Sequence, residues 1–272
     1  NQFNFKIKAF SRLELDISNS NELDKVISNL KPDFVINAGA YTNVDKAEDE
    51  QFLANKINNI SLKKLSDYCR KNNSTLVHFS TDYVFDGTSE TPYKEEDETN
   101  PINAYGKSKL NGEKTIMSSG SNFLIIRTSW VYSEFKKNFL KTMLNITDKE
   151  NIKIIDDQIG CPTYAPDIAY TTLSIIDKSR NLKLSHLYHY CGDNPCSWAE
   201  FAESIFNIAK KEELIDKIPK ISKIVTKEYY TKAKRPIYSV LDCKKIDRDF
   251  DIKNSDLVNG IEKSIKSLKQ IK

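Results

Sequence analysis

The chain has 272 residues, 39% hydrophobic and 29% charged, which is enough for one large or two modest globular domains. Its 41 basic and 38 acidic residues are interspersed and give a net charge of +3, unlike the clustered basic face of a nucleic-acid-binding protein. No segment approaches the roughly eighteen apolar residues of a membrane helix, and residues 1–10 lack the apolar block of a signal peptide. These features predict a cytoplasmic protein with no nucleic-acid or membrane partner.

The five cysteines are odd in number and irregularly spaced, which argues against a disulfide framework. A zinc site is an alternative for the region that holds His186, His189, Cys191 and Cys196. The spacing fits no common zinc pattern, however, and the apolar residues 187–188 favour a strand with reduced thiols. We therefore expect no metal.

The first segments alternate between strand and helix patterns. Residues 5–10 alternate apolar and polar side chains, which predicts a strand, and residues 18–21 can cap a helix that reaches Leu30. Phe34–Asn37 is continuously apolar before its final asparagine, which predicts a strand buried on both faces. A loop over 38–45 leads into a helix that reaches about Asn72.

The pattern continues with a strand at 76–79, a helix at 104–117 and a strand at 123–127. Strands that alternate with helices predict an α/β fold with a doubly wound parallel sheet. Ligands bind such sheets at the carboxyl ends of the strands, where polar residues stand at 37–40, 80–82 and 128–130. Further on, we expect a helix from about residue 138, a strand at 152–155 and a helix at 167–178. Ser197 and Glu200 form a capping-box pattern, and 263–272 reads as the solvated face of a final helix.

Three side chains around the 104–117 helix suit carbonyl reduction. Tyr105 and Lys109 are four residues apart and share one helix face, where an ammonium should lower the pKa of the phenol. Thr81 ends the strand that precedes this helix. The threonine hydroxyl and the tyrosine can both bind a carbonyl oxygen while hydride reaches its carbon.

The segments STDYVFDG from Ser80, NAYGKSKLNGEK from Asn103 and RTSWVY from Arg127 carry a family resemblance. They resemble the extended short-chain dehydrogenase/reductase superfamily and, within it, the dTDP-4-dehydrorhamnose reductase family, over about residues 5–241. The resemblance implies a Rossmann-like NAD(P)-binding domain over 1–160 and a smaller, partly interwoven α/β substrate-binding region over 161–272. It also implies an NADPH- or NADH-dependent oxidoreductase whose substrate is the nucleotide sugar dTDP-4-dehydro-L-rhamnose.

One part of the family pattern is missing. The eight glycines form no G-x-x-G turn, and none precedes Gly39, although a dinucleotide fold opens with a strand and a glycine-rich turn. That first strand is central in the sheet, so we expect the natural protein to have an N-terminal part that this sequence lacks.

The resemblance assigns the remaining site residues. Arg12 stands where the ribose is read and favours NADPH over NADH, although an exposed turn arginine is an equal alternative. The other cofactor contacts would be Asp16, Ile17, Ala40, Tyr41 and Thr42, together with Tyr105 and Lys109. The substrate contacts would be Thr81, Asp82, Trp130 and Arg235, with core packing as the alternative for the tryptophan and a surface basic cluster for the arginine.

Three alternatives stay open at this point. The chain could be a related nucleotide-sugar reductase or epimerase, or a non-catalytic regulatory subunit like the beta subunit of methionine adenosyltransferase.

Some members of the resembled family dimerise through magnesium and glutamates. No convincing glutamate set is visible, so we predict no metal and leave a homodimer possible.

Overall fold

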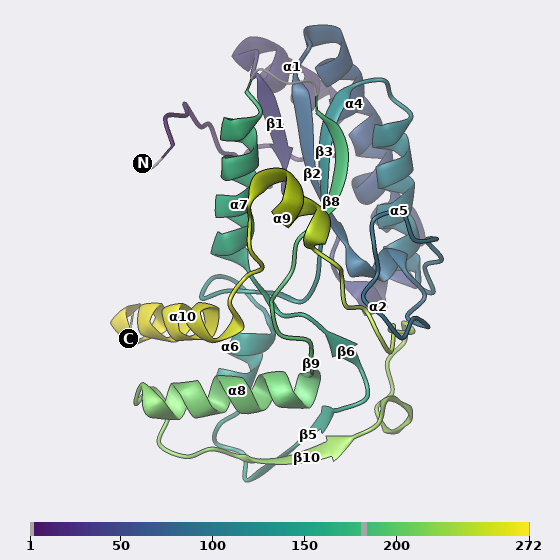
Figure 1. Cartoon of the computed structure of the whole chain (residues 1–272). Helices are drawn as coiled ribbons and strands as arrows, with labels where there is room; N and C mark the ends of the chain where they lie inside the picture. Colours follow the sequence, from purple (N-terminus) through teal and green to yellow (C-terminus); the bar gives the residue numbers. More distant parts are fainter. Residues whose placement is uncertain (1–2, 181–183, 272) are drawn as a thin grey trace.

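The main sheet of the molecule is parallel (Figure 1). The computed structural model describes residues 3–180 and 184–271, and within them this sheet has four strands in the order β1-β2-β3-β8. The strands are β1 (Phe34–Asn37), β2 (Thr75–Thr81), β3 (Asn122–Thr128) and β8 (Ser185–His189). Since every pair in this sheet is parallel and helices connect the strands, the predicted α/β fold class is confirmed.

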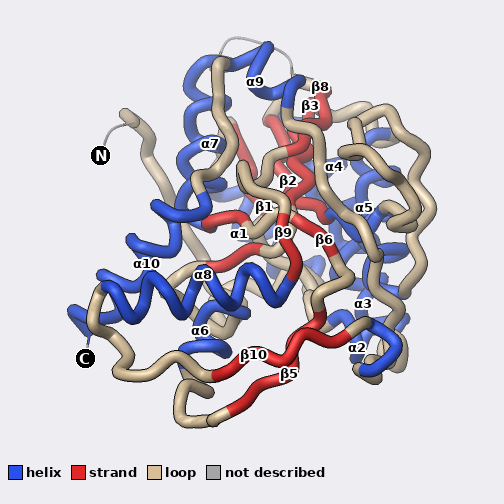
Figure 2. Tube along the Cα trace, turned by 60° about the horizontal axis from the view of Figure 1, so that its bottom comes forward, coloured by secondary structure: helices blue, strands red, loops and turns tan. Residues whose placement is uncertain are grey.

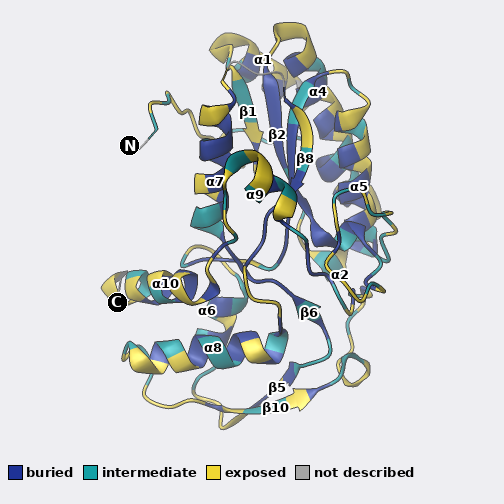
Figure 3. Cartoon of the chain, viewed as in Figure 1, coloured by how far each residue is buried: buried dark blue, intermediate teal, exposed yellow. Residues whose placement is uncertain are grey.

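Helices cover both faces of the sheet, as the period of two along β2 requires. Leu76 packs in one hydrophobic cluster with α1 (Ser20–Leu30), α4 (Ser61–Asn72) and α5 (Ala104–Met117). Val77 points the other way, into a cluster with α7 (Ala165–Lys178) and α9 (Lys244–Phe250). The predicted helix at 104–117 is therefore confirmed, and Figure 3 shows the central strands buried between these layers.

The stretch between β1 and β2 is more broken than the single predicted helix. It consists of α2 (Val44–Ala47), α3 (Gln51–Asn55), a π-helical turn η1 (Lys56–Ile60) and then α4, which ends at Asn72 as expected. A 3-10 turn η2 (Asp82–Val84) follows β2.

A second group of elements lies at one end of the sheet (Figures 1 and 2). Its helices are α6 (Phe139–Leu144), α8 (Trp198–Lys211) and α10 (Leu257–Ile271). Its strand pairs are β5 (Asn151–Ile155) with β10 (Lys220–Ile224), β4 (Val131–Tyr132) with β7 (Thr163–Tyr164), and β6 (Ile159–Gly160) with β9 (Cys196–Ser197). A last 3-10 turn is η3 (Thr226–Glu228). The expected capping box of Ser197 and Glu200 is present at the start of α8.

The cluster under α7 in the main sheet and the cluster under α8 and α10 in the second group both contain residues from distant parts of the chain. The cluster under α8 and α10 includes Tyr132 and Ile154 as well as Ile265, and the cluster under α7 includes Val77 as well as Leu241. Both clusters thus draw on both sides of residue 160, and the division into 1–160 and 161–272 remains our proposal for an interwoven second region.

Two strand expectations are wrong. Residues 5–10 form no strand and are mostly exposed. An alternating pattern makes a strand only where a neighbouring strand offers hydrogen bonds, and no described strand lies beyond β1. For the same reason β1 is an edge strand of the described sheet, and its Ile36 is exposed instead of buried on both faces.

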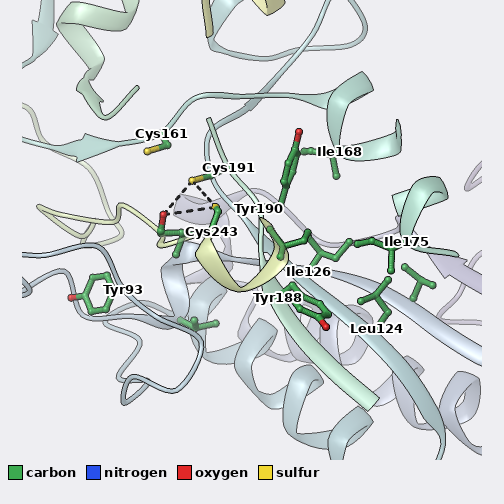
Figure 4. Close-up of a cluster of buried hydrophobic side chains, with 14 of the residues drawn as sticks. Tyr93, Leu124, Ile126, Cys161, Ile168, Ile175, Tyr188, Tyr190, Cys191 and Cys243 are labelled. Atoms are coloured by element: carbon green, nitrogen blue, oxygen red, sulfur yellow. Dashed lines mark hydrogen bonds between the residues drawn. The ribbon is translucent and has the colours of Figure 1, made fainter. Parts of the chain in front are cut away.

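Figure 4 shows the cluster under α7, where Cys191 and Cys243 lie with their sulfurs 3.6 Å apart. All five cysteines are buried and free. In residues 3–180 and 184–271, no helix combines the length and the apolar composition that crossing a bilayer requires.

Candidate active site

Thr81 and Asp82 stand at the carboxyl end of β2, where the strand turns into η2. The Thr81 hydroxyl donates to Asp82 Oδ1 at 2.9 Å and accepts the Tyr83 backbone N–H at 3.2 Å. Both residues are buried. Burial raises the pKa of the Asp82 carboxyl to about 6, against the lowering effect of nearby hydroxyls that include Thr81.

Tyr105 comes from the first turn of α5, which packs closely on η2. The Asn103 side chain caps the helix by accepting the Gly106 N–H at 2.8 Å. A Cβ at Gly106 would lie 2.1 Å from the Tyr83 carbonyl oxygen, so only glycine permits this approach. The Tyr105 ring meets the Tyr83 ring edge to face at 5.9 Å, and the Thr81 hydroxyl is near enough to affect the pKa of the Tyr105 phenol.

The pKa of Tyr105 does not follow the sequence-based expectation. Burial raises it to about 12; the Thr81 hydroxyl lowers it in part, and the Asp82 carboxylate raises it further. The expected lowering by Lys109 is wrong, because the lysine amine faces the sheet. Its Nζ donates to the Phe79 carbonyl oxygen at 2.6 Å and lies 3.1 Å from His78 Nε2.

Lys109 itself is 2% exposed. Burial lowers its pKa to about 8, and the Glu113 carboxylate one turn further along α5 opposes that shift. The sequence placed Lys109 on the correct helix face but could not show how fully the sheet covers it.

Buried polar atoms at the ends of two strands leave hydrogen-bonding capacity open. Ser80 Oγ on β2 and Thr128 Oγ1 on β3 have no hydrogen-bond partner within residues 3–180 and 184–271. Unpartnered buried hydroxyls are costly, so an edge that keeps them is suited to a polar ligand. The carboxyl end of a parallel sheet is also where a dinucleotide or a nucleotide sugar binds.

The residues expected around the cofactor lie beside the end of β1. Arg12 is exposed and forms an ion pair with Asp16 at 3.7 Å, and Asp16 accepts the Ser18 N–H at 2.8 Å. Ile17 packs on Gly39, with its Cδ1 3.3 Å from the position that a Cβ there would occupy. Arg12, Asp16 and Ile17 therefore approach the sheet edge from one side.

Ala40, Tyr41 and Thr42 follow β1, and Asn58 from η1 binds the Tyr41 backbone. Asn58 accepts the Tyr41 N–H at 2.8 Å and donates to the Tyr41 carbonyl oxygen at 3.0 Å. The same amide lies 2.9 Å from the Ser108 hydroxyl on α5. The loop after β1 and the helix that carries Lys109 are thus tied together through one buried asparagine.

The expected substrate residues occupy two separate places. Trp130, with φ of +46°, stacks on Trp198 with ring centroids 3.5 Å apart and an interplanar angle of 4°. Arg235 forms a bidentate contact with Asp45, with Nη2–Oδ2 at 2.7 Å and Nη1–Oδ1 at 3.3 Å. The backbone carbonyl oxygen of the preceding residue, Lys234, accepts the Asn103 side-chain N–H at 2.8 Å, so the segment that carries Arg235 lies against the start of α5.

Sequence reasoning missed His78, Asn58 and Trp198. A histidine inside the otherwise apolar run LVHF was a usable signal, because a buried histidine needs hydrogen-bond partners. Asn58 lies in the π-helical turn, a feature that often occurs at functional sites but that no sequence pattern marked here. Nothing in the sequence pairs Trp198 with Trp130, since 68 positions separate them.

Comparison with known proteins places this site in a family. A family model described as "RmlD substrate binding domain" matches residues 1–270. The chain is 39% identical over 256 residues to a dTDP-4-dehydrorhamnose reductase of Aggregatibacter actinomycetemcomitans, which covers 93% of this chain and 87% of that protein. It is 37% identical over 239 residues to the Salmonella typhimurium protein of the same name, covering 87% and 80%.

Solved structures give the same result. A dTDP-4-dehydrorhamnose reductase from Clostridium acetobutylicum superposes with a TM-score of 0.90 at 34% identity, covering 98% of this chain and 91% of that one. The Bacillus anthracis dTDP-4-dehydrorhamnose reductase, solved in complex with NADP, has a TM-score of 0.89 at 32% identity, covering 98% and 92%.

Proposed function

The chain belongs to the family of the RmlD substrate binding domain, and on that premise we propose that it is an NAD(P)H-dependent dTDP-4-dehydrorhamnose reductase. The reaction would convert dTDP-4-dehydro-L-rhamnose into dTDP-L-rhamnose, for nucleotide-sugar and cell-surface polysaccharide synthesis in the cytoplasm. The observation that carries the proposal is the close packing of the first turn of α5, which holds Tyr105, on the turn that follows Thr81 at the carboxyl end of β2, with Lys109 buried on the same helix.

Tyr105 acts as the general acid in this proposal. Its raised pKa keeps the phenol protonated at neutral pH, so it can donate its proton to the C4 carbonyl oxygen. The Thr81 hydroxyl donates to Asp82 Oδ1 in the structure and would turn its O–H to the same carbonyl oxygen when the substrate binds. Asp82 would shape the substrate end.

A nicotinamide cofactor would supply hydride to the carbonyl carbon when bound. Lys109 would hold the nicotinamide ribose, and the loop residues Ala40, Tyr41 and Thr42 would lie along the ribose and pyrophosphate. Arg12, Asp16 and Ile17 would lie near the adenosine end. NADPH is the preferred cofactor in this proposal, because an arginine suits a 2′-phosphate and a family member was solved with NADP.

Trp130 and Arg235 would recognise the rest of the substrate. The tryptophan face can cover the apolar side of a pyranose ring, and a guanidinium can bind a diphosphate in bidentate fashion. Asp45 competes for that guanidinium, so the substrate diphosphate would replace a carboxylate that already occupies it.

The test is an assay of the purified protein with dTDP-4-dehydro-L-rhamnose and NADPH. We expect one NADPH to be oxidised per dTDP-L-rhamnose formed. Turnover of the sugar without net NADPH consumption would instead identify an epimerase. A folded protein that turns over no nucleotide sugar would favour the regulatory-subunit alternative.

A further inference from the structure

A buried chain of hydrogen bonds runs from the end of β1 to Lys109. The Gly39 backbone N–H donates to Asn37 Oδ1 at 3.1 Å, and Asn37 Nδ2 lies 3.1 Å from His78 Nδ1. On the other side of the imidazole, His78 Nε2 lies 3.1 Å from Lys109 Nζ. Asn37, His78 and Lys109 are all at least 95% buried, so water cannot substitute for these partners.

The direction of each hydrogen bond follows from the Gly39 N–H. A backbone N–H can only donate, so the Asn37 atom that it contacts is the amide oxygen. The Asn37 atom that faces His78 is then the NH₂ group, which can only donate, and His78 Nδ1 must accept. A neutral imidazole that accepts at Nδ1 carries its proton on Nε2. Burial lowers the pKa of His78 well below its ordinary value, so the ring is neutral.

The Nε2–H of His78 therefore points at the Lys109 nitrogen. An ammonium group has no lone pair and cannot accept this hydrogen bond, whereas a neutral amine can. The amine can at the same time donate to the Phe79 carbonyl oxygen, which lies 2.6 Å away. These hydrogen-bond directions are those of the uncharged form of Lys109, which is the major form only above its pKa of about 8.

We propose that His78 is a positioning residue that donates its Nε2–H to Lys109 and thereby favours the uncharged amine, with Asn37 holding His78 in the required tautomer. A proton that arrives on Lys109 removes the acceptor of this hydrogen bond, so the amine must turn away from His78 to become charged. The expected effect on kcat/KM rests on the proposed reductase function, whereas the expected tautomer of His78 does not.

Other ionisable groups around Lys109 act in the opposite direction or are already paired. Glu113 on α5 favours the charged lysine, but both of its oxygens bind Arg127 from β3. Asp82 in η2 acts on Tyr105, which stands one turn before Lys109. Among the described residues, the groups of β2 that contact the Lys109 amine are the His78 ring and the Phe79 carbonyl oxygen.

The tautomer can be measured without any activity. The chain has three histidines, so long-range ¹H–¹⁵N correlation spectra of ¹⁵N-histidine-labelled protein resolve each ring, and His78→Gln identifies the His78 signals. We expect a neutral ring protonated on Nε2 from about pH 6 to about pH 9. A ring protonated on Nδ1, or an imidazolium at neutral pH, would overturn the proposal even if the reductase assay succeeds.

The pH dependence of kcat/KM tests the effect on Lys109. If charged Lys109 is the active form, the rate falls as pH rises through its pKa of about 8. A glutamine at position 78 can turn its carbonyl oxygen toward the ammonium, so His78→Gln should move this alkaline limb upward by about one pH unit. His186→Gln, at an exposed position of β8, should leave the limb in place.

An alkaline limb that stays at the wild-type pH in a folded His78→Gln variant would reject the proposal. If that variant fails to fold, the tautomer of the unaltered protein still decides. A correct tautomer in a protein with no reductase activity would support the Asn37–His78–Lys109 arrangement and reject the proposed reaction.

Discussion

Arg127 on β3 and Glu113 on α5 form a buried bidentate ion pair, with Nη2–Oε2 at 2.7 Å and Nε–Oε1 at 3.0 Å. The guanidinium also lies over the Phe85 ring, 5.1 Å from its centroid. Because α5 carries Tyr105 and Lys109, this pair ties the helix of the candidate site to β3, the strand that ends at Thr128. Its loss should therefore weaken both the fold and the site.

We expect Glu113→Gln to lower the free energy of unfolding by about 3–5 kcal/mol, because it leaves a buried guanidinium without a counter-charge. Urea unfolding monitored by circular dichroism measures this change. Asp24→Asn, which removes the exposed pair with Lys64, is the matched control and should cost less than about 1 kcal/mol. Equal costs for the two substitutions would contradict the importance of the buried pair.

We expect Tyr105→Phe to lower kcat by about 10²–10⁴-fold, since the variant keeps the ring but loses the proton donor. The free energy of unfolding should change little. Tyr170→Phe, at an exposed position of α7, is the control for the loss of a phenol elsewhere. A folded Tyr105→Phe protein with wild-type kcat would rule out the tyrosine as the acid.

The Asp82 carboxyl should make the free energy of unfolding fall as pH rises. Its pKa in the folded state is about 6, compared with 3.8 ordinarily, so between these values the folded protein binds more protons than the unfolded chain. About two pKa units correspond to roughly 3 kcal/mol, lost between about pH 4 and about pH 6. Asp82→Asn should remove this dependence and be more stable than wild type above about pH 6. The free energies of unfolding of the two proteins, measured at about pH 4.5 and about pH 7.5, test this prediction. The same change between the two pH values in both proteins would refute it.

Arg235→Lys should raise KM for the nucleotide sugar about tenfold and change kcat less than about twofold, because a lysine cannot form the bidentate contact. Lys234→Ala, at the exposed neighbouring position, should leave both parameters unchanged. Steady-state kinetics at saturating NADPH separates the two effects. A KM equal to that of wild type would remove Arg235 from the substrate site.

Sequence reasoning succeeded where local signals decide the structure. The helix at 104–117 was predicted at both of its ends, because an asparagine cap precedes a helical run and serines and a glycine follow it. The strand at 76–79 was found as the core of β2 for a similar reason, since a short apolar run between polar turns has few alternatives. The strand at 5–10 failed because a strand needs a partner that no local pattern reports.

The proposed chemistry could be read from the sequence, because Thr81, Tyr105 and Lys109 are recognisable by residue type and spacing along one strand and one helix. The tertiary structure alone decided their electrostatics. Burial raised the pKa of Tyr105, although a neighbouring cation was expected to lower it. Packing turned the Lys109 amine toward His78, which lies on β2 and is 31 positions earlier in the sequence. Spacing along a helix determines which side chains share a face, whereas desolvation and hydrogen-bond partners depend on what the rest of the chain packs against that face.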